Sequence, residues 1–476
     1  METPKCSNIR LKDLIAIVLT IFLLLHTLLS STHFTTHILH LLTINPLITL
    51  SCAWCVLLSI FYYYYSRPHP VLLLNYTCYK PPSSQKGTYE ASADFVRRTK
   101  GFTPESQDFM RRIYLNSGIG DETYVPKFVF ETKYESKLEA SADEARQGVI
   151  SAVDSLLSKT NIHTSLIDSL IINCGSFSPV PSISSIVVNH FKLKPTVKTY
   201  NLSGMGCGSG VIAIHTAAKL LQSSRKLSLA LVVITENISS NWYFGNNRSM
   251  LVSNCIFRVG AAAALMTNDP SCRRVAKMEI VNSLRTHHGA DDPSYLAAFQ
   301  EEDENGAIGV SLTKDLTRVA GTNLQDHIRI LAPRVLPVSQ LALHGYHAIV
   351  SVLSLGESKP QRVPDFKTAF DHFCIHTGGK AVIQQVERVM GLGDEVTEPA
   401  RMTLHRFGNT SSSSVLYELA YFEAKGRVRK GDRMWMVGFG TGFKICSLVW
   451  KSLSDLNLES DNPWSDCIHR YPLKSW

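Results

Sequence analysis

The sequence predicts an α/β protein made of two duplicated halves, preceded by a pair of membrane-spanning helices. Strand-like segments recur in one order about 200 residues apart, and glycine-rich stretches follow several of them. Two uncharged apolar stretches lie near the N-terminus. Chance does not readily repeat three segments in one order at nearly one offset, so the repeat indicates a duplication of α/β units.

The repeat pairs three segments of the first half with three of the second. DSLIINCGS, from Asp168, and DHFCIHTGG, from Asp371, are 203 residues apart. KTYNLSGMGCGSG matches TLHRFGNTSSSS at an offset of 202, and LALVVITE matches RMWMVGFG at 204. At equivalent points the first half carries Cys207, whereas the second carries His376 and Asn409. We expect all three at strand ends, where their side chains converge on a shared pocket.

Cys207 has the sequence surroundings of a nucleophile. Apolar residues with helical spacing follow it, from Val211 to Leu221, which places Cys207 at a strand-to-helix junction. The positive end of a helix and a nearby imidazolium both favour the thiolate, which is the reactive form. The glycines of NLSGMGCGSG let backbone amides approach an acyl group. An inert buried Cys in a glycine-rich turn is the alternative, and the duplicated halves favour the nucleophile.

Five motifs together resemble those of a known family. NLSGMGCGSG, RTHHGADD, DHFCIHTGGKAV, LHRFGNTSSSS and CYKPP are similar to motifs of the plant-type 3-ketoacyl-CoA synthases, the membrane-bound condensing enzymes of very-long-chain fatty acid elongation. The resemblance implies a duplicated, thiolase-like fold of five layers, α-β-α-β-α. Two departures bear on chain-length preference and turnover: Gly208 and Ser209 stand where Ser-Ala is usual, and HTGGK replaces the commoner HAGGR.

The same resemblance implies roles for individual residues. Cys207 would carry the acyl group, while His376 and Asn409 would hydrogen-bond the enolate that forms when malonyl-CoA loses carbon dioxide. Gly440, within GFGTG, would donate a backbone N–H to an oxyanion. Three more histidines occupy motif positions, where positioning and proton transfer are both open: His287, His372 and His405.

No resident metal or redox cofactor is expected beside the substrates acyl-CoA and malonyl-CoA. His372 and His376 are four residues apart and would share one face of a strand. No third ligand with zinc-like spacing accompanies them, and the expected chemistry requires no metal. The eleven cysteines are scattered, which favours a reducing cytosolic setting over a disulfide framework.

The N-terminus predicts a membrane hairpin with helices at about 14–30 and 45–65. Both stretches are uncharged and near the length that a bilayer requires. Basic residues precede the first and follow the second, while none lies between them, so the positive-inside rule puts both ends in the cytosol. A cleaved signal peptide is the alternative for the first stretch, which lacks a clear small-residue cleavage site.

The chain thus divides into a hairpin (1–70), a half with the nucleophile (71–280) and a half with His376 and Asn409 (281–476). The net charge of +8 does not indicate nucleic-acid binding, because no basic cluster is interleaved with stacking aromatics in a recognised module. One such cluster is instead a candidate for the phosphates of coenzyme A or for anionic lipid.

The resemblance further implies an endoplasmic reticulum membrane location with a cytosolic catalytic domain and a homodimer. It also implies an elongase complex with ketoacyl-CoA reductase, hydroxyacyl-CoA dehydratase and enoyl-CoA reductase. Three alternatives remain. A papain-like protease shares the Cys-His-Asn order but does not explain the duplication. A catalytically silent elongase scaffold is disfavoured by the intact triad, and a chalcone-synthase-like type III polyketide synthase by the hairpin and CYKPP.

Overall fold

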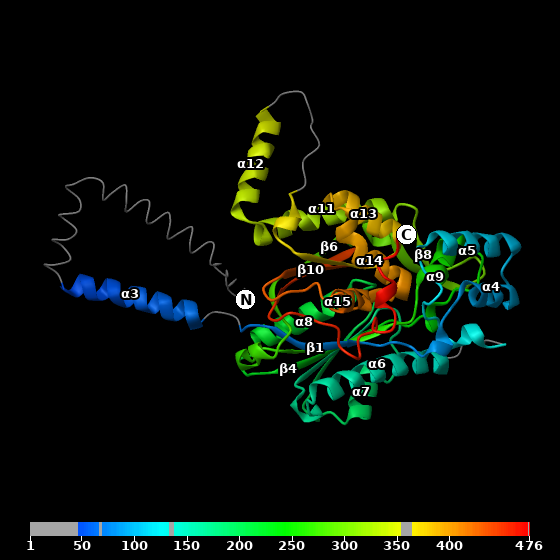
Figure 1. Cartoon of the computed structure of the whole chain (residues 1–476), viewed down its shortest axis with the longest axis horizontal. Helices are drawn as coiled ribbons and strands as arrows, with labels where there is room; N and C mark the ends of the chain where they lie inside the picture. The colour runs from blue at the N-terminus through cyan, green and yellow to red at the C-terminus, as the bar shows by residue number, and fades with distance from the viewer. Residues whose placement is uncertain (1–45, 66–68, 133–137, 354–363, 475) are drawn as a thin grey trace. The chain divides into compact units, whose positions relative to one another are not determined.

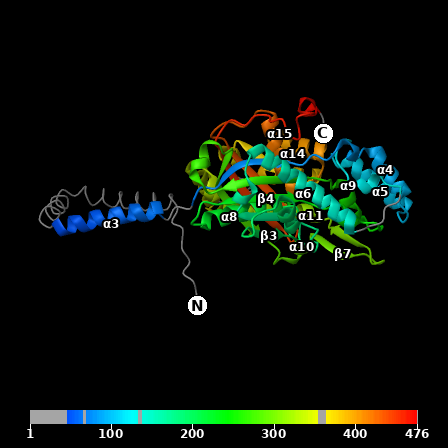
Figure 2. The same cartoon turned by 90° about the horizontal axis from the view of Figure 1, so that it is seen from below.

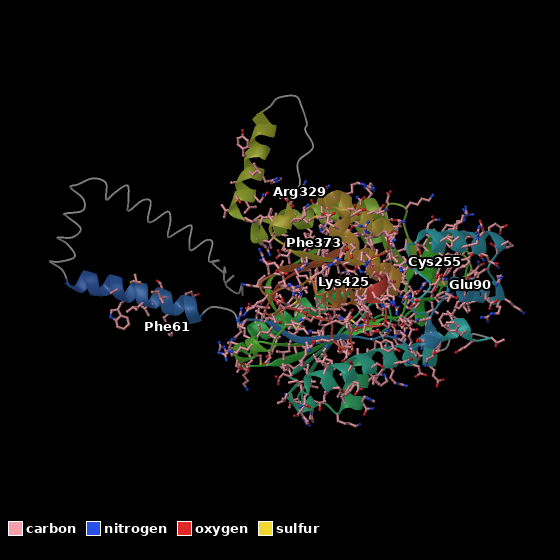
Figure 3. The ribbon with its side chains drawn as sticks, viewed as in Figure 1. Phe61, Glu90, Cys255, Arg329, Phe373 and Lys425 are labelled. Atoms are coloured by element: carbon pink, nitrogen blue, oxygen red, sulfur yellow. The ribbon has the colours of Figure 1, made fainter. Side chains whose placement is uncertain are left out.

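The computed structural model describes residues 46–65, 69–132, 138–353, 364–474 and 476. The chain forms two compact units, Met1–Pro68 and His69–Trp476. In the first unit, α3 (Pro46–Tyr65) is apolar on all sides, and Figure 3 shows Phe61 projecting from it. Within the described ranges, no helix combines the length and hydropathy needed to cross a membrane. The other predicted span, at about 14–30, lies outside the described residues.

The second unit is built on one nine-stranded sheet in the order β3-β2-β4-β5-β1-β6-β11-β10-β9, with β7 and β8 as a separate hairpin. The strands are β1 (Leu72–Cys78), β2 (Ser169–Cys174), β3 (Lys198–Leu202), β4 (Leu229–Thr235), β5 (Ala261–Thr267), β6 (Met278–His287), β7 (Ala298–Glu302), β8 (Ile308–Leu312), β9 (His372–Ile375), β10 (Arg433–Gly440) and β11 (Lys444–Ser452).

The sheet repeats one arrangement twice. In the first half β2 is parallel to β4, which is antiparallel to β5; in the second, β9 is parallel to β10, which is antiparallel to β11. The halves meet where β1 pairs with β6, through Leu72 opposite Glu279 and Leu73 opposite Met278. The predicted boundary between residues 280 and 281 falls inside β6. The first half adds β3, which is parallel to β2 and precedes Cys207, while β9 precedes His376, so both residues follow strands as expected.

The described part of this unit also contains helices, some of which form three layers around the two halves of the sheet. They are α4 (Tyr89–Arg98), α5 (Pro104–Asn116), α6 (Leu138–Thr160), α7 (Ile183–Phe191), α8 (Ser209–Ser223), α9 (Arg248–Ile256), α10 (Asp292–Leu296), α11 (Leu316–Val335), α12 (Val338–Leu353), α13 (Lys380–Met390), α14 (Asp394–Phe407) and α15 (Ser414–Ala424).

Helices α8 and α15 lie between the half-sheets and contact strands of both, as Figure 1 shows. Helix α6 covers the outer face of the first half, where Figure 2 shows it across β4. Helices α11 and α13 lie on the outer side of the second half. The unit therefore has five layers, α-β-α-β-α, in which the central helix α15 is almost completely buried and α8 is buried over most of its length.

The predicted strand in TLHRF, the second-half counterpart of KTYNL, is wrong. These residues belong to α14, which begins with Asp394 and Glu395 in its first turn and ends with His405 and Arg406 in its last. Charges of these signs stabilise the two ends of a helix dipole. Buried Ala400, Leu404 and Phe407 follow helical spacing. The second half therefore lacks a counterpart of β3 among the described strands, and Asn409 follows a helix.

The helix predicted after Cys207 is confirmed and is α8. The run after His376 forms α13, with Gly391 in the left-handed region as its C-cap. The segment that ends before Gly426 is α15.

Candidate active site

Cys207 lies between β3 and the N-terminus of α8, as predicted. Strand β3 ends at Leu202, and α8 begins at Ser209 with Gly208 as its N-cap. The first N–H groups of a helix have no partner within it and carry partial positive charge. Cys207 thus stands where a developing anion on sulfur or on a bound acyl oxygen is favoured.

The glycines around Cys207 allow two loops to touch. A Cβ on Gly206, which has a φ of +64°, would lie 2.5 Å from the backbone nitrogen of Thr441. A Cβ on Gly208 would lie 2.9 Å from the nitrogen of Gly440, and one on Gly440 would lie 2.2 Å from the oxygen of Met205. The structure therefore places Gly440 directly against the nucleophile loop, where its oxyanion role stays a prediction.

His376 follows β9 and is buried, with 3% of its surface exposed. Its backbone nitrogen donates to the oxygen of Val437 on β10, and the neighbouring Gly438 approaches Gly208, since a Cβ there would lie 3.1 Å from the Cα of Gly208. Its Nδ1 lies 2.8 Å from the Oγ of Ser414 at the start of α15. This contact leaves Nε2 as the ring nitrogen for chemistry.

Asn409 follows α14 and is fixed by both its backbone and its side chain. Its nitrogen donates to Ile256, its oxygen accepts from Arg258, and it forms a parallel bridge with Phe257. Its Oδ1 accepts a hydrogen bond from the backbone nitrogen of Ser411 at 2.8 Å. Because Oδ1 is occupied, the amide group of Asn409 is left with N–H donors to offer, as an enolate site requires.

A buried carboxylate, that of Glu236, lies beside the thiol. Its Oε1 accepts hydrogen bonds from the nitrogen and hydroxyl of Ser176, and its Oε2 accepts one from the hydroxyl of Ser411 at 2.8 Å. Burial raises the pKa of Cys207 to about 12, and the charge of Glu236 raises this pKa too, while a hydrogen bond with Ser411 lowers it. Burial lowers the pKa of His376 to about 4.

These shifts favour a neutral thiol and a neutral imidazole in the resting protein. They oppose the predicted thiolate–imidazolium pair between Cys207 and His376, because burial penalises both charged forms at once. A neutral imidazole can accept the thiol proton as the sulfur attacks, and it can also donate from Nε2. The first half-reaction needs a base that accepts the thiol proton, and the second needs a hydrogen-bond donor to the enolate.

A cavity of about 330 Å³ opens onto Cys207. Its walls include Glu236 and Ser411 on one side and the apolar rings of Trp242 and Phe299. His376 and Asn409 are not among its lining residues, and both are buried. The cavity is therefore suited to a largely apolar substrate that reaches the sulfur from outside.

The structure places the other predicted histidines at three separate points. His287 ends β6 opposite Lys444, which lines the cavity. His372 begins β9, so it lies at the opposite end of that strand from His376, where Nε2 is 2.9 Å from Oδ2 of Asp432. His405, on α14, has its Nδ1 2.9 Å from the hydroxyl of Tyr471. Only His287 is near the cavity, and the roles of all three stay predictions.

Sequence reasoning missed three polar residues of the site: Glu236, Ser411 and Ser414. The quoted motifs contained all of them, since Glu236 ends LALVVITE and the two serines belong to TSSSS. For Ser411 and Ser414 the available signal was a run of four consecutive serines that begins two residues after Asn409.

Two family models match the chain. Residues 63–351 match the FAE1/type III polyketide synthase-like protein family, and residues 367–452 match the C-terminal part of 3-oxoacyl-[acyl-carrier-protein (ACP)] synthase III. The first match covers the whole of the first half and continues into the second, and the other match lies within the second half.

Curated relatives and solved structures agree with these matches. The chain is 46% identical to 3-ketoacyl-CoA synthase 17 of Arabidopsis thaliana over 412 residues, or 87% of this chain and 84% of the relative. It is 47% identical to 3-ketoacyl-CoA synthase 16 of the same plant over 418 residues, 87% of this chain and 84% of that protein.

Among solved structures, a fungal type III polyketide synthase, ORAS, superposes with a TM-score of 0.62 at 17% identity, covering 80% of this chain and 99% of that one. This likeness shows the fold alone, and it confirms the thiolase-like α/β architecture. The identity to the plant proteins goes further: the chain belongs to the 3-ketoacyl-CoA synthase family.

Proposed function

We propose that this protein condenses malonyl-CoA with a long-chain acyl-CoA, releasing carbon dioxide and giving a 3-oxoacyl-CoA that is two carbons longer, the first step of very-long-chain fatty acid elongation. The observation that carries the proposal is Cys207 at a helix N-terminus, facing an apolar-walled cavity and linked through Ser411 to Asn409. Membership of the family supports it.

The first half-reaction loads the acyl group. The sulfur of Cys207 attacks the thioester carbon of acyl-CoA, and its proton passes to Nε2 of neutral His376. The carbon–sulfur bond to coenzyme A then breaks, and the leaving thiolate takes the proton from Nε2 of His376. The ring then loses its Nδ1 proton and gains one on Nε2 by exchange with solvent, so that Nε2–H is present for the second half-reaction. Backbone N–H groups near Cys207 and Gly440 hold the oxyanion. The acyl group is then a thioester of Cys207, and free CoA-SH has left.

The second half-reaction makes the new carbon–carbon bond. Malonyl-CoA loses carbon dioxide, and the electron pair of the broken bond becomes an enolate whose oxygen accepts hydrogen bonds from His376 Nε2–H and the Asn409 amide. The enolate carbon attacks the acyl carbonyl and expels the sulfur of Cys207, which takes a proton from solvent. No electron leaves or enters, so this balance requires neither a redox cofactor nor a metal.

The remaining histidines take supporting roles in this proposal. His287, near Lys444 at the cavity wall, is suited to hold the malonyl carboxylate or a thioester oxygen. His372 and His405 hold Asp432 and Tyr471, so they support the loops around the second half rather than the reacting atoms.

We further propose that a membrane hairpin precedes the catalytic unit, at the endoplasmic reticulum with both ends in the cytosol, and that the protein is a homodimer within an elongase complex of ketoacyl-CoA reductase, hydroxyacyl-CoA dehydratase and enoyl-CoA reductase. The all-round apolar surface of α3, with exposed Trp54 and Phe61, supports the membrane part. In sealed microsomes, a tag after Trp476 should be open to protease; its protection would contradict the hairpin.

The test is condensation by the full-length protein in detergent with long-chain acyl-CoA and malonyl-CoA. The malonyl-CoA is labelled either at its free carboxyl carbon or at its methylene carbon. Carboxyl label should appear as carbon dioxide, and methylene label as one 3-oxoacyl-CoA. A product with several added malonyl units would instead indicate a type III polyketide synthase. If acyl-CoA leads neither to labelled carbon dioxide nor to labelled product, the protein is a silent scaffold.

A further inference from the structure

Four consecutive serines, Ser411 to Ser414, form a buried turn between Asn409 and α15, which we call the serine turn. Their side chains are at most 1% exposed. Ser411–Ser413 form a short 3-10 helix, and Ser414 is the first residue of α15. A buried hydroxyl is costly unless it is hydrogen-bonded. Each of the four has a partner, so the partners show what the turn holds.

Ser411 connects Asn409 to the carboxylate of Glu236. Its backbone is in the left-handed region, with a φ of 53°, where a residue other than Gly or Asn is uncommon. This conformation accompanies the bond from its N–H to the Asn409 Oδ1, at 2.8 Å, while its hydroxyl donates to Glu236 at 2.8 Å. A backbone N–H can only donate, so it fixes which end of the Asn409 amide is oxygen.

Ser414 serves His376 differently, because a hydroxyl both donates and accepts. Its Oγ lies 2.8 Å from Nδ1. When Nε2 takes the Cys207 proton, the imidazolium carries a proton on both nitrogens and Nδ1–H donates to Ser414. When neutral His376 donates from Nε2 to the enolate, Nδ1 carries no proton and accepts from Ser414. A fixed carbonyl or amide would satisfy only one of these states.

We propose that Ser411 and Ser414 are the positioning residues of the enolate site: Ser411, anchored by Glu236, aims the Asn409 amide, and Ser414 sustains both protonation states of His376 that the two half-reactions need. This inference rests on the proposed function. Ser412 and Ser413 have no such role, because their hydroxyls donate to the backbone oxygens of Thr235, at 3.4 Å, and Thr410, at 3.0 Å.

The same turn supplies matched controls. Ser411→Ala, Ser412→Ala, Ser413→Ala and Ser414→Ala each remove one equally buried hydroxyl from the full-length protein. Each variant is first loaded to completion with labelled acyl-CoA, which removes the Cys207 proton from the comparison. Malonyl-CoA carrying a carboxyl label is then added, and the release of labelled carbon dioxide is timed. Thermal unfolding is measured in parallel.

The Ser411 and Ser414 variants should release carbon dioxide about 10-fold to 100-fold more slowly, the size of effect expected when a catalytic group is misplaced by a fraction of an ångström to an ångström. Their KM for malonyl-CoA should not change. The Ser412 and Ser413 variants should stay within about twofold of the unaltered protein. Ser414→Ala should also slow acyl loading, and Ser414→Thr, which keeps the hydroxyl, should recover part of both rates.

Equal losses in all four variants, in step with their stability, would show that the turn is only structural and would overturn the proposal. Unchanged rates in Ser411→Ala and Ser414→Ala would also overturn it, as would a well-folded Ser414→Thr as slow as Ser414→Ala. If the unaltered protein itself releases no carbon dioxide with any acyl-CoA, it is the proposed condensation that fails.

Discussion

The two halves of the catalytic unit share one strand arrangement but differ at the point that matters for chemistry. In the first half, β3 leads to Cys207 at the N-terminus of α8. In the second, α14 takes the place of that strand and leads to Asn409 and the serine turn. One half thus presents a nucleophile to a helix dipole, and the other presents hydrogen-bond donors held by the serine turn. The two duplicated halves therefore carry different parts of one site, the nucleophile in the first half and the hydrogen-bond donors in the second.

The largest effect should come from the nucleophile itself. Cys207→Ala and Cys207→Ser should abolish condensation, because neither can form and expel a thioester at this position. Loss should be complete in a product assay, with thermal unfolding close to that of the unaltered protein. Condensation above a trace in the Ser variant would contradict the assignment of Cys207.

The donors of the second half should separate the two half-reactions. Asn409→Ala should still form acyl-Cys207 but decarboxylate malonyl-CoA about 10²-fold to 10³-fold more slowly, the usual cost of one preorganised donor to an oxyanion. His376→Ala should be slower in both steps, because it also removes the base. Trapping labelled acyl-protein and timing carbon dioxide release measures the two rates.

Asn173 gives the matched control for His376, because it occupies the equivalent point of the first half and is also buried. Its Nδ2 donates to the oxygen of Leu202, so Asn173→Ala should lower stability without separating the two rates. If Asn409→Ala blocks labelling of Cys207 while decarboxylation proceeds, Asn409 would instead orient a protease-like Cys–His pair.

The charge beside the nucleophile predicts a pH effect of moderate size. The pKa of Cys207 is raised, so alkylation of its thiol by iodoacetamide should rise with pH across the whole range in which the protein stays folded. Glu236→Gln removes a negative charge that raises this pKa, so its alkylation curve should move to lower pH and be several-fold faster at a fixed pH.

Glu144→Gln is the control, because Glu144 is a partly buried carboxylate of the same half but bonds the backbone of Ile238 and Ser239. Its curve should match that of the unaltered protein. A Glu236→Gln curve that moves to higher pH would show that the carboxylate assists ionisation of the thiol.

Backbone conformation should give the smallest effects and compares the halves directly. Gly206 and Gly408 are equivalent in the repeat, and both have a positive φ and a crowded Cα: a new Cβ would lie 2.5 Å from Thr441 N and 2.3 Å from Arg258 Cγ. Gly204 has a φ of +66° with open space. Gly204→Ala should cost about 1 kcal/mol of unfolding free energy, and the other two ~2–4 kcal/mol, measured by denaturant unfolding. Equal costs at the three sites would show that crowding contributes little.

Sequence alone predicted the parts of this site that depend on local pattern. Cys207 between a strand and a helix, and His376 after a strand, followed from the repeat and from apolar spacing. The alignment also forced TLHRF into the role of KTYNL, although its own spacing and end charges favour a helix. Local helix propensity was the correct guide for TLHRF, and the similarity between the halves was not.

The burial that sets the protonation states could not be predicted in the same way. Glu236 meets Ser176 and Ser411 only because β2, β4 and the serine turn come together in the folded unit. The lowered pKa of His376 depends on how completely its neighbours exclude water from it. Such long-range desolvation leaves no local pattern in a single sequence. The sequence therefore offered nothing against the predicted ion pair between Cys207 and His376.

The position of β1 in the sheet has a consequence for how the protein is made. The first strand in the chain lies in the middle of the nine-stranded sheet, between β5 and β6. Its apolar residues leave the ribosome long before Ala261, where β5 begins. At ribosomal speeds of ~5–20 residues per second, the wait is about 10–40 s. During that interval LLLNYTC is an unpaired strand beside a nascent apolar helix, so a binding partner that shields it should raise the yield of folded enzyme without touching the finished active site.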